Sequence, residues 1–272
     1  MEKGGPNLES ESVVKEVTSM SYVIYEKKGH IAYITLNRPD RLNAFGTELM
    51  QQLMESETKF AEDDDAWIAV YTGAGDRAFS AGRDLKEAAT STSQSETVTP
   101  QRGKLFVEHV KPTIAAVNGL AYGGGFEFAL SRDIRICSEN ATFALAEVRV
   151  GLCPPSGSFN LPRLIGLSNA MWWLLSGEPI DSNNALRMGV VTKVVPQAEL
   201  LSTATQMAEI ICQNAPLAVR ATKHLARIGM EVPLEYAQDL GIGTIQSVWG
   251  SEDAIEGAKA FVEKRKPVWK MR

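Results

Sequence analysis

The segment GLAYGGGFEFALSRD, residues 119–133, contains three consecutive glycines directly before a short apolar stretch that carries one glutamate. Glycine adopts positive φ angles and permits close backbone approach, so the N–H groups of Gly123, Gly124 and Gly125 are able to face a cavity. The following FEFALS predicts a buried helix, whose N-terminus adds free N–H groups and a positive dipole end. Such a turn suits a developing oxyanion, although a purely structural strand-to-helix turn has the same pattern.

The sequence around this segment alternates between strand and helix patterns. Short β-branched runs, PTIAAVNG and DIRICS, flank the glycines and predict strands. Residues 22–25 and 31–36 are β-rich runs separated by a polar turn, which is a hairpin pattern, and residues 43–63 have the approximate period of an amphipathic helix. A further strand is predicted at 67–72, and the pattern from about residue 201 onward is mostly helical.

This order of elements favours an α/β core followed by a helical C-terminal part. We expect a mobile N-terminal arm at residues 1–20, a catalytic core at 21–200 and a helical region at 201–272. The chain shows no short fixed-period repeat.

Composition excludes several classes of protein. The 28 basic and 33 acidic residues give a net charge of -5, without the basic excess of a general nucleic-acid binder. No segment reaches the roughly 18 unbroken apolar residues of a membrane span, and the N-terminus lacks a signal or transit pattern, so we expect a cytoplasmic protein. Three widely spaced cysteines without clustered histidines indicate neither a disulfide framework nor a zinc site.

A second glycine turn, FSAGRDL at residues 79–85, follows another predicted strand and offers a second N–H group, that of Arg83 or a neighbour. Two donors from separate turns would form an oxyanion hole that polarises a carbonyl and holds an enolate. The nearby YTGAGDRA has a G-x-G-x-x-A arrangement, but no apolar helical period follows it. Nicotinamide or flavin binding is therefore not expected.

Two glutamates lie in mostly apolar surroundings, Glu127 after the glycines and Glu147 in TFALAEVRVGL. A glutamate among apolar neighbours is costly unless it is paired, protonated or used. If the two lie close together, their titrations couple and one favours the protonated state, as an acid and base pair requires. Taken singly, each could instead be a surface or ion-paired residue.

The chain resembles the crotonase superfamily, the enoyl-CoA hydratase and isomerase family, from about residue 22 to the end. The matching blocks occur in family order: ITLNRPDRLNAF, YTGAGDRAFSAGRDLK, KPTIAAVNGLAYGGGFEFALSRD, ATFALAEVRVGL, LPRLIG and AFVEKRKPVW. Within the family, GGGFEFAL, TFALAE and SEDAIEGAKAFVEKRKPVWK are most similar to the carnitinyl-CoA dehydratase type.

The resemblance implies an α/β fold, a crotonase-like spiral of ββα units with a helical C-terminal trimerisation region, and a homotrimer or dimer of trimers. It implies an acyl-CoA substrate, whose coenzyme A belongs to the thioester, with no other cofactor and no metal. The family's oxyanion donors fall on the N–H groups of Arg83 and Gly124, and its catalytic carboxylates on Glu127 and Glu147. Its CoA contacts fall on Arg83, Asp84, Leu85 and Lys86, with Phe261 and Lys264 reaching CoA from a neighbouring subunit.

The implied reaction is hydration of a 2-enoyl-CoA thioester to 3-hydroxyacyl-CoA, or the reverse dehydration. Alternatives are another crotonase reaction, such as isomerisation, hydrolysis or decarboxylation of a branched or cyclic acyl-CoA, and a catalytically silent binding or scaffold protein. Both glutamates and both glycine turns are present, which argues against the silent protein.

The sequence departs from the family pattern in two places. After Glu147, most hydratases read Pro-Gly-x-Gly-Gly, whereas CPPSGS places Pro155 at the first glycine and Ser158 at the last. In relatives the first glycine's N–H helps to hold the catalytic water, and proline has no N–H. Either the glutamates alone hold the water here, or the pocket is reshaped for a different acyl group or reaction. Arg83 also stands where small residues are common, and its side chain could meet a CoA phosphate, an acidic acyl group or solvent.

Overall fold

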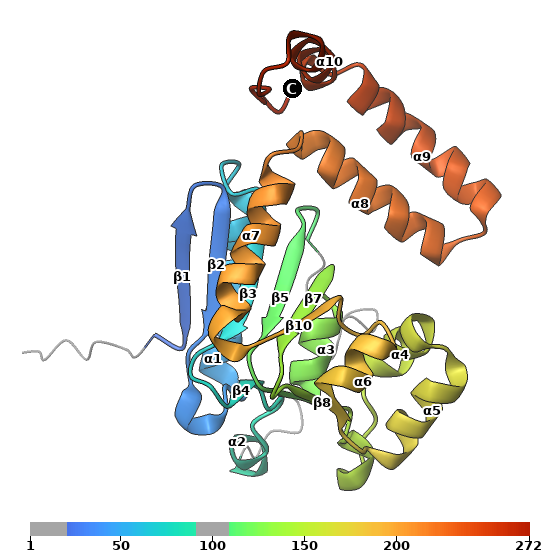
Figure 1. The fold of residues 1–272 in the computed structure, drawn as a ribbon. Helices are drawn as coiled ribbons and strands as arrows, with labels where there is room; N and C mark the ends of the chain where they lie inside the picture. Colours follow the sequence, from blue (N-terminus) through green and yellow to red (C-terminus); the bar gives the residue numbers. More distant parts are fainter. Residues whose placement is uncertain (1–20, 91–108) are drawn as a thin grey trace, which may run out of the picture.

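The computed structural model describes residues 21–90 and 109–272. The predicted arm at 1–20 and the segment at 91–108 lie outside these ranges. A six-stranded sheet forms the centre of the molecule (Figure 1). Its strands, in spatial order, are β1 (Val23–Lys28), β2 (Ile31–Leu36), β3 (Ile68–Gly73), β5 (Thr113–Val117), β7 (Ile134–Ser138) and β10 (Lys193–Val195).

The first two strands pair antiparallel, which confirms the predicted hairpin, and all other neighbours in this sheet pair parallel. A second sheet of four short strands runs in the order β4 (Ala78–Ser80), β6 (Leu120–Tyr122), β8 (Thr142–Ala144) and β9 (Ile180–Asp181). Each of β3, β5 and β7 is followed within a few residues by a strand of the second sheet. The chain therefore builds repeated units of one long strand, one short strand and a helix or helical turn.

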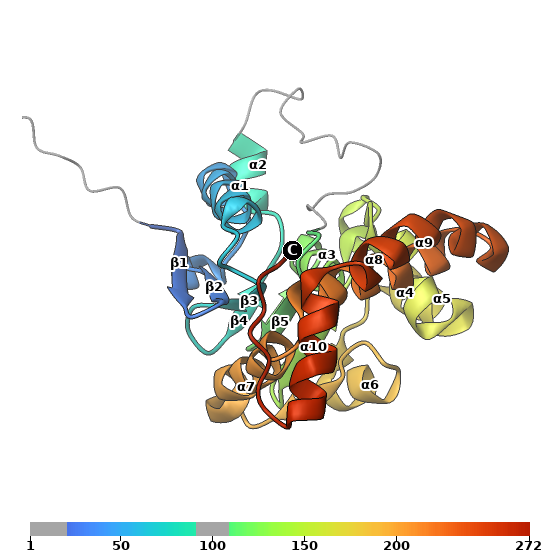
Figure 2. The ribbon, with the colours of Figure 1, turned by 90° about the horizontal axis from the view of Figure 1, so that it is seen from above.

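Helices cover both faces of the large sheet. Helix α1 (Thr47–Glu62) and helix α7 (Leu200–Cys212) lie on opposite faces (Figures 1 and 2). Leu49, Leu53 and Phe60 of α1 are buried, as the helical spacing predicts, and α7 buries Leu200, Ala204 and Ala208 against the sheet. Burial on both faces explains why β5 reads as a continuous apolar run.

The remaining helices of the core lie around the second sheet. They are α2 (Leu85–Thr90), α3 (Gly124–Leu130), α4 (Gly157–Ile165), α5 (Leu167–Ser176) and α6 (Ser182–Arg187). Short 3₁₀ turns lie at Pro39–Arg41 (η1), Glu147–Val150 (η4) and Gln197–Glu199 (η5).

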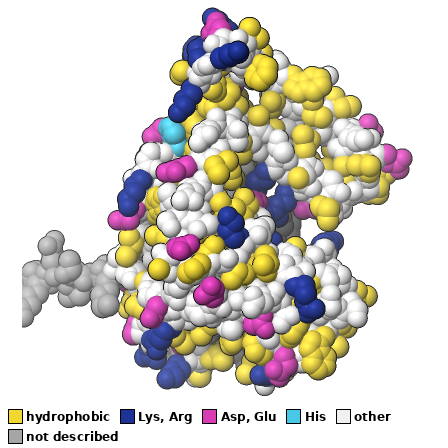
Figure 3. Space-filling view, viewed as in Figure 1, with side chains coloured by type: hydrophobic (Ala, Val, Ile, Leu, Met, Phe, Trp, Pro, Cys, Tyr) yellow, Lys and Arg dark blue, Asp and Glu magenta, His cyan; other side chains and the backbone are white. Residues whose placement is uncertain are grey.

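The C-terminal region is helical, as predicted, but its helices have two different surroundings. Helix α7 packs on the sheet, whereas α8 (Pro216–Glu231), α9 (Leu234–Trp249) and α10 (Glu252–Glu263) extend away from it (Figures 1 and 2). These helices expose many large apolar side chains (Figure 3). They include Leu234, Tyr236, Leu240, Trp249, Ile255 and Phe261. None of the helices in the two described ranges has the length and apolarity that crossing a bilayer requires.

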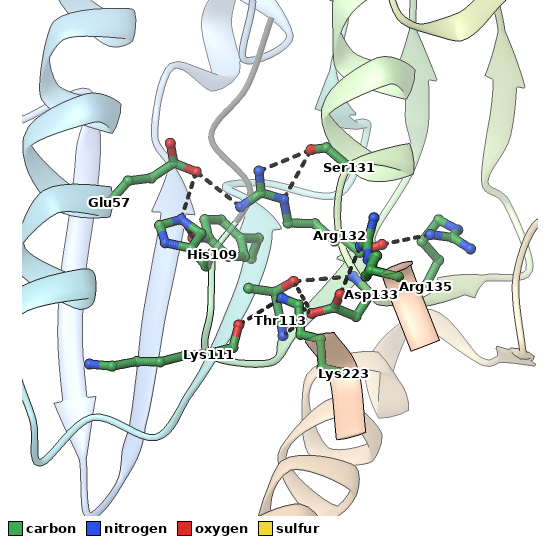
Figure 4. Close-up of polar contacts among 11 residues, drawn as sticks. Glu57, His109, Lys111, Thr113, Ser131, Arg132, Asp133, Arg135 and Lys223 are labelled. Carbon is green, nitrogen blue, oxygen red and sulfur yellow. Dashed lines mark hydrogen bonds and ion pairs between the residues drawn. The ribbon is translucent and has the colours of Figure 1, made fainter. Parts of the chain in front are cut away.

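A buried polar cluster connects the end of α3 to α1 (Figure 4). The Arg132 side chain is 1% exposed, and its Nη1 lies 3.0 Å from Oε1 of Glu57, which also lies 3.4 Å from Nε2 of His109. The guanidinium lies over the rings of Tyr71 and Phe128, 4.6 Å from each centroid. Because Phe128 follows Glu127 in α3, this cluster fixes the helix that carries the candidate catalytic glutamate.

Candidate active site

The two glycine turns meet in the structure. Gly82 has a φ of +78°, and a Cβ built on it would lie 2.6 Å from the Tyr122 carbonyl oxygen and 2.8 Å from the Gly124 nitrogen. Any larger residue would force these backbone segments apart, and a positive φ also favours glycine. Turns some 40 positions apart in the sequence are therefore in direct contact.

The contact leaves the two predicted donors unused. Phe45 pairs with Arg83 in an isolated parallel bridge, in which the Phe45 N–H donates to the Gly82 carbonyl and the Asp84 N–H donates to the Phe45 carbonyl. Since the neighbours of Arg83 make both bonds, its own N–H faces away from Phe45. Within the described residues, neither the Arg83 N–H nor the Gly124 N–H has a hydrogen-bond acceptor. Both are available for a carbonyl oxygen.

Gly123 brings Glu147 to the same turn. Its φ is +52°, its N–H donates to the Ala144 carbonyl at 2.8 Å, and a Cβ built on it would lie 3.2 Å from Oε1 of Glu147. Glu147 begins the 3₁₀ turn η4, which directly follows the loop after β8. The absence of a side chain at Gly123 therefore leaves room for this carboxyl group.

Glu127 is held by the turn that departs from the family pattern. Its side chain projects from α3, is 1% exposed, and Oε1 accepts hydrogen bonds from the N–H groups of Ser156 (2.8 Å) and Gly157 (2.7 Å). These donors lie at the N-terminus of α4, where unpaired N–H groups and the helix dipole stabilise a negative charge. Sequence analysis missed both donors. The signal that could have found them is the start of a helix just after Pro155, because the first N–H groups of a helix have no partner within it.

Glu147 has different surroundings. Its Oε2 is buried and has no hydrogen-bond partner among residues 21–90 and 109–272. Burial, with a smaller contribution from the negative charge of Glu127, raises the pKa of Glu147 to about 7. Glu127 thus accepts two backbone N–H groups, whereas the raised pKa of Glu147 leaves it partly protonated near neutral pH, and two carboxyl groups in such different surroundings suit an acid and base pair.

The predicted CoA-binding residues of the second glycine turn differ in their exposure to solvent. Arg83, Leu85 and Lys86 are exposed at the turn, whereas Asp84 is buried. Its carboxylate accepts from the N–H groups of Lys86 and Glu87 and from the side chain of Arg38. Both oxygens of this carboxylate therefore bond to groups of the protein itself.

Phe261 and Lys264 lie apart from the other candidates. They are at the end of α10, on the side of the molecule away from α2 (Figure 1), and Phe261 is 85% exposed. A single chain does not bring them to the glycine turns. Among the described residues, no group of three His, Cys, Asp or Glu side chains is placed to hold a metal ion.

Comparison with known proteins identifies the family. Residues 26–272 match the family model described as enoyl-CoA hydratase/isomerase. The chain is 40% identical over 256 residues to carnitinyl-CoA dehydratase from Citrobacter koseri, covering 91% of this chain and 98% of that one. It is 41% identical over 254 residues to the Escherichia coli carnitinyl-CoA dehydratase, covering 90% and 97%.

Solved structures agree with the sequence matches. An enoyl-CoA hydratase from Bacillus anthracis superposes with a TM-score of 0.86 at 33% identity, covering 92% of this chain and 100% of that one. An enoyl-CoA hydratase/isomerase from Mycobacterium paratuberculosis gives 0.84 at 38% identity, covering 93% and 100%. The chain belongs to the enoyl-CoA hydratase/isomerase (crotonase) family and has its α/β fold with two mixed sheets and C-terminal helices.

Proposed function

We propose that the protein adds water across the double bond of a 2-enoyl-CoA thioester, or removes it from the 3-hydroxyacyl-CoA. The observation that supports this most is the pairing of two N–H donors, without acceptors among the described residues, with two carboxyl groups in different surroundings. Hydration needs all four, because a carbonyl must be polarised while one proton is removed from water and another is delivered to carbon.

The N–H groups of Arg83 and Gly124 would donate to the thioester oxygen. Negative charge develops on this oxygen when water attacks C3, and each donor of an oxyanion hole contributes about 3 kcal/mol to transition-state stabilisation. The contact between Gly82 and Gly124 keeps the two donors on adjacent turns, which supports their binding of one oxygen atom.

The two glutamates would divide the proton transfers. Glu127, whose Oε1 accepts two backbone N–H groups, takes a proton from the water whose oxygen bonds to C3. Glu147, protonated near neutral pH, gives its proton to C2 as the enolate returns to the thioester. One proton remains on the pair before and after the reaction, and dehydration follows the same steps in reverse.

The turn CPPSGS supports a water site that differs from the family pattern. Pro155 has no N–H, and the next two N–H groups donate to Oε1 of Glu127. Oε2 of Glu127 has no hydrogen-bond partner within the described residues, and it is not fully buried. The attacking water would therefore be held by this oxygen and not by a backbone N–H at position 155.

The acyl group and the assembly are further parts of the proposal. Relatives named carnitinyl-CoA dehydratase, at 40% and 41% identity, make carnitinyl-CoA the first substrate to test beside crotonyl-CoA. A homotrimer or dimer of trimers would bring Phe261 and Lys264 of one subunit to the CoA of its neighbour, and the exposure of Phe261 supports such a role.

The test is a product analysis with crotonyl-CoA, a branched enoyl-CoA and carnitinyl-CoA. With the two enoyl-CoA substrates, hydration predicts loss of the enoyl thioester absorbance and a gain of one water in the mass of the acyl group. With carnitinyl-CoA, the reverse reaction predicts a gain of this absorbance and a loss of one water. Free CoA, carbon dioxide or a moved double bond as the main product would instead support hydrolysis, decarboxylation or isomerisation. Binding of all three thioesters without any reaction would favour a silent binding protein.

A further inference from the structure

A closed charged cluster lies behind the turn that presents the Arg83 N–H. Asp84 is 8% exposed, its Oδ2 lies 3.0 Å from Nη1 of Arg38, and its Oδ1 accepts from the N–H groups of Lys86 (3.1 Å) and Glu87 (3.2 Å). Burial raises the pKa of Asp84, but the Glu87 N–H and the charge of Arg38 outweigh it, so the pKa lies below its usual range. Asp84 is therefore a charged residue whose two carboxylate oxygens both accept hydrogen bonds, directly before α2.

Arg38 is the cation at the centre of this cluster. Its side chain is 17% exposed, and Nη1 also donates to the Ala44 carbonyl at 3.4 Å and lies 4.0 Å from Oε2 of Glu87. Glu87 in turn accepts from the Thr47 N–H at 2.8 Å, at the N-terminus of α1. The cluster thus joins the residues after β2, the start of α1 and the start of α2.

The orientation of the Arg83 N–H depends on its two neighbours. On one side is Gly82, at a φ of +78°, whose carbonyl belongs to the same peptide as the Arg83 N–H and accepts from the Phe45 N–H at 2.7 Å. On the other side is Asp84, whose backbone N–H bonds to Phe45 and whose carboxylate is held by Arg38. The bond from Phe45 therefore holds this peptide at its carbonyl, and the anchored Asp84 holds the chain on the other side of Arg83.

We propose that Arg38 is a positioning residue, whose ion pair with Asp84 holds the Arg83 N–H in the direction needed to donate to a thioester oxygen. This inference rests on the proposed function, because it assigns Arg38 to the oxyanion hole of that reaction. It also gives Asp84 a different role from the predicted CoA contact, since both of its carboxylate oxygens are engaged within the protein.

The test measures carbonyl polarisation directly. Infrared difference spectra of bound crotonyl-CoA labelled with ¹³C at the thioester carbonyl report the strength of hydrogen bonds to that oxygen. Hydration rates are measured beside them, together with the affinity for a CoA thioether, which has no carbonyl. The variants are Arg38→Met, Arg38→Lys and Asp84→Asn, and the control is Arg41→Met. Arg41 lies on the same segment, is 46% exposed and pairs only loosely with Asp40, at 3.9 Å.

We expect the carbonyl stretching frequency of crotonyl-CoA to be lower when it is bound to the wild type than when it is free in solution. In Arg38→Met and Asp84→Asn, much of this shift should be lost. Their kcat should fall by about 10- to 100-fold, less than or similar to the loss of a whole oxyanion donor. Thioether affinity should stay within about threefold, since the remaining CoA contacts do not involve the carbonyl oxygen. Arg38→Lys should recover part of the shift, because lysine keeps the charge but not the second contact.

Carbonyl shifts and rates in Arg38→Met and Asp84→Asn equal to those of Arg41→Met would overturn the inference. If Arg38→Met does not fold, Asp84→Asn, which conserves the side-chain volume, decides the result. A wild-type carbonyl shift without hydration would contradict the proposed function alone, and the variants would still test the positioning role. A wild type without any carbonyl shift would contradict both.

Discussion

Glu127 and Glu147 are the same residue type with opposite environments. Glu127 receives two backbone N–H groups at the start of α4, whereas Oε2 of Glu147 is buried without a partner. Hydrogen bonds to the charged form favour ionisation, and desolvation opposes it. The difference between the two surroundings, more than the residue type, supports the assignment of base and acid.

Sequence analysis identified these glutamates and the two glycine turns, because a carboxylate in an apolar run and consecutive glycines are local signals. It did not identify the N–H groups of Ser156 and Gly157 as partners of Glu127, nor Arg38 as the partner of Asp84. Those pairs are separated by 29, 30 and 46 positions. Contacts of this kind follow from the tertiary fold and leave no periodic pattern in the sequence.

Replacement of Gly82 by alanine tests the contact between the turns. The new Cβ would lie 2.8 Å from the Gly124 nitrogen, so we expect the Gly82→Ala variant to lose hydration by at least about 100-fold, as when an oxyanion donor is removed. The control is Gly29→Ala, since Gly29 also has a positive φ, +56°, but nothing lies within 4 Å of its built Cβ. Steady-state rates and thermal unfolding of both variants provide the comparison. Similar activity in the two would show that the turns do not need this contact.

At the scale of elements, the long segments were predictable and the short ones were not. The hairpin of β1 and β2, helix α1 and the C-terminal helices have clear periodicity. The strands of the second sheet are two or three residues long, too short for an alternating pattern to be detected. Helix α2 is only six residues long, and it is stabilised by Asp84, whose carboxylate accepts from two N–H groups of its first turn.

The attachment of α3 to α1 gives a prediction about stability. Removing Arg132 leaves Glu57 as a buried charge beside His109, and breaking such a buried pair costs about 3–5 kcal/mol. We expect Arg132→Met to lower the free energy of unfolding in urea by that amount, and a further Glu57→Gln replacement to recover part of it.

The matched control is Arg149→Met, which removes one member of the exposed pair with Glu178. Exposed pairs contribute about 0–1 kcal/mol, so this variant should unfold close to the wild type. An Arg132→Met protein as stable as Arg149→Met would show that the buried cluster does not hold α3.

At the scale of the whole molecule, α8, α9 and α10 extend from the core and expose large apolar side chains (Figures 1 and 3). Apolar surfaces of this extent are typical of interfaces. Sequence analysis predicted the helices from their pattern, but their extension from the core could not be read from it, because α7 has a similar composition and packs on the sheet.

Self-association through these helices is the corresponding prediction. The molar mass from light scattering should equal that of three or six chains, and Trp249→Asp on α9, at a side chain 79% exposed, should shift it towards the monomer. The control Gln51→Asp adds the same charge on the exposed side of α1 and should leave the mass unchanged. A monomeric wild type would exclude a contribution of Phe261 and Lys264 to a neighbour's site.

The most direct measurement of the central claim is the pH dependence of kcat/KM for crotonyl-CoA hydration, in the wild type and in Glu147→Gln. Glu147 must be protonated to give its proton to C2, and its pKa is raised to about 7. The wild-type rate should therefore be high at pH 6 and fall by about tenfold for each unit above pH 7.

The rate of Glu147→Gln should be at least about 100-fold below that of the wild type at pH 6 and show no decline near pH 7. The control Glu139→Gln, at an exposed glutamate, should match the wild type. A wild-type rate that is constant from pH 6 to pH 9, or full activity in Glu147→Gln, would contradict the two-glutamate mechanism.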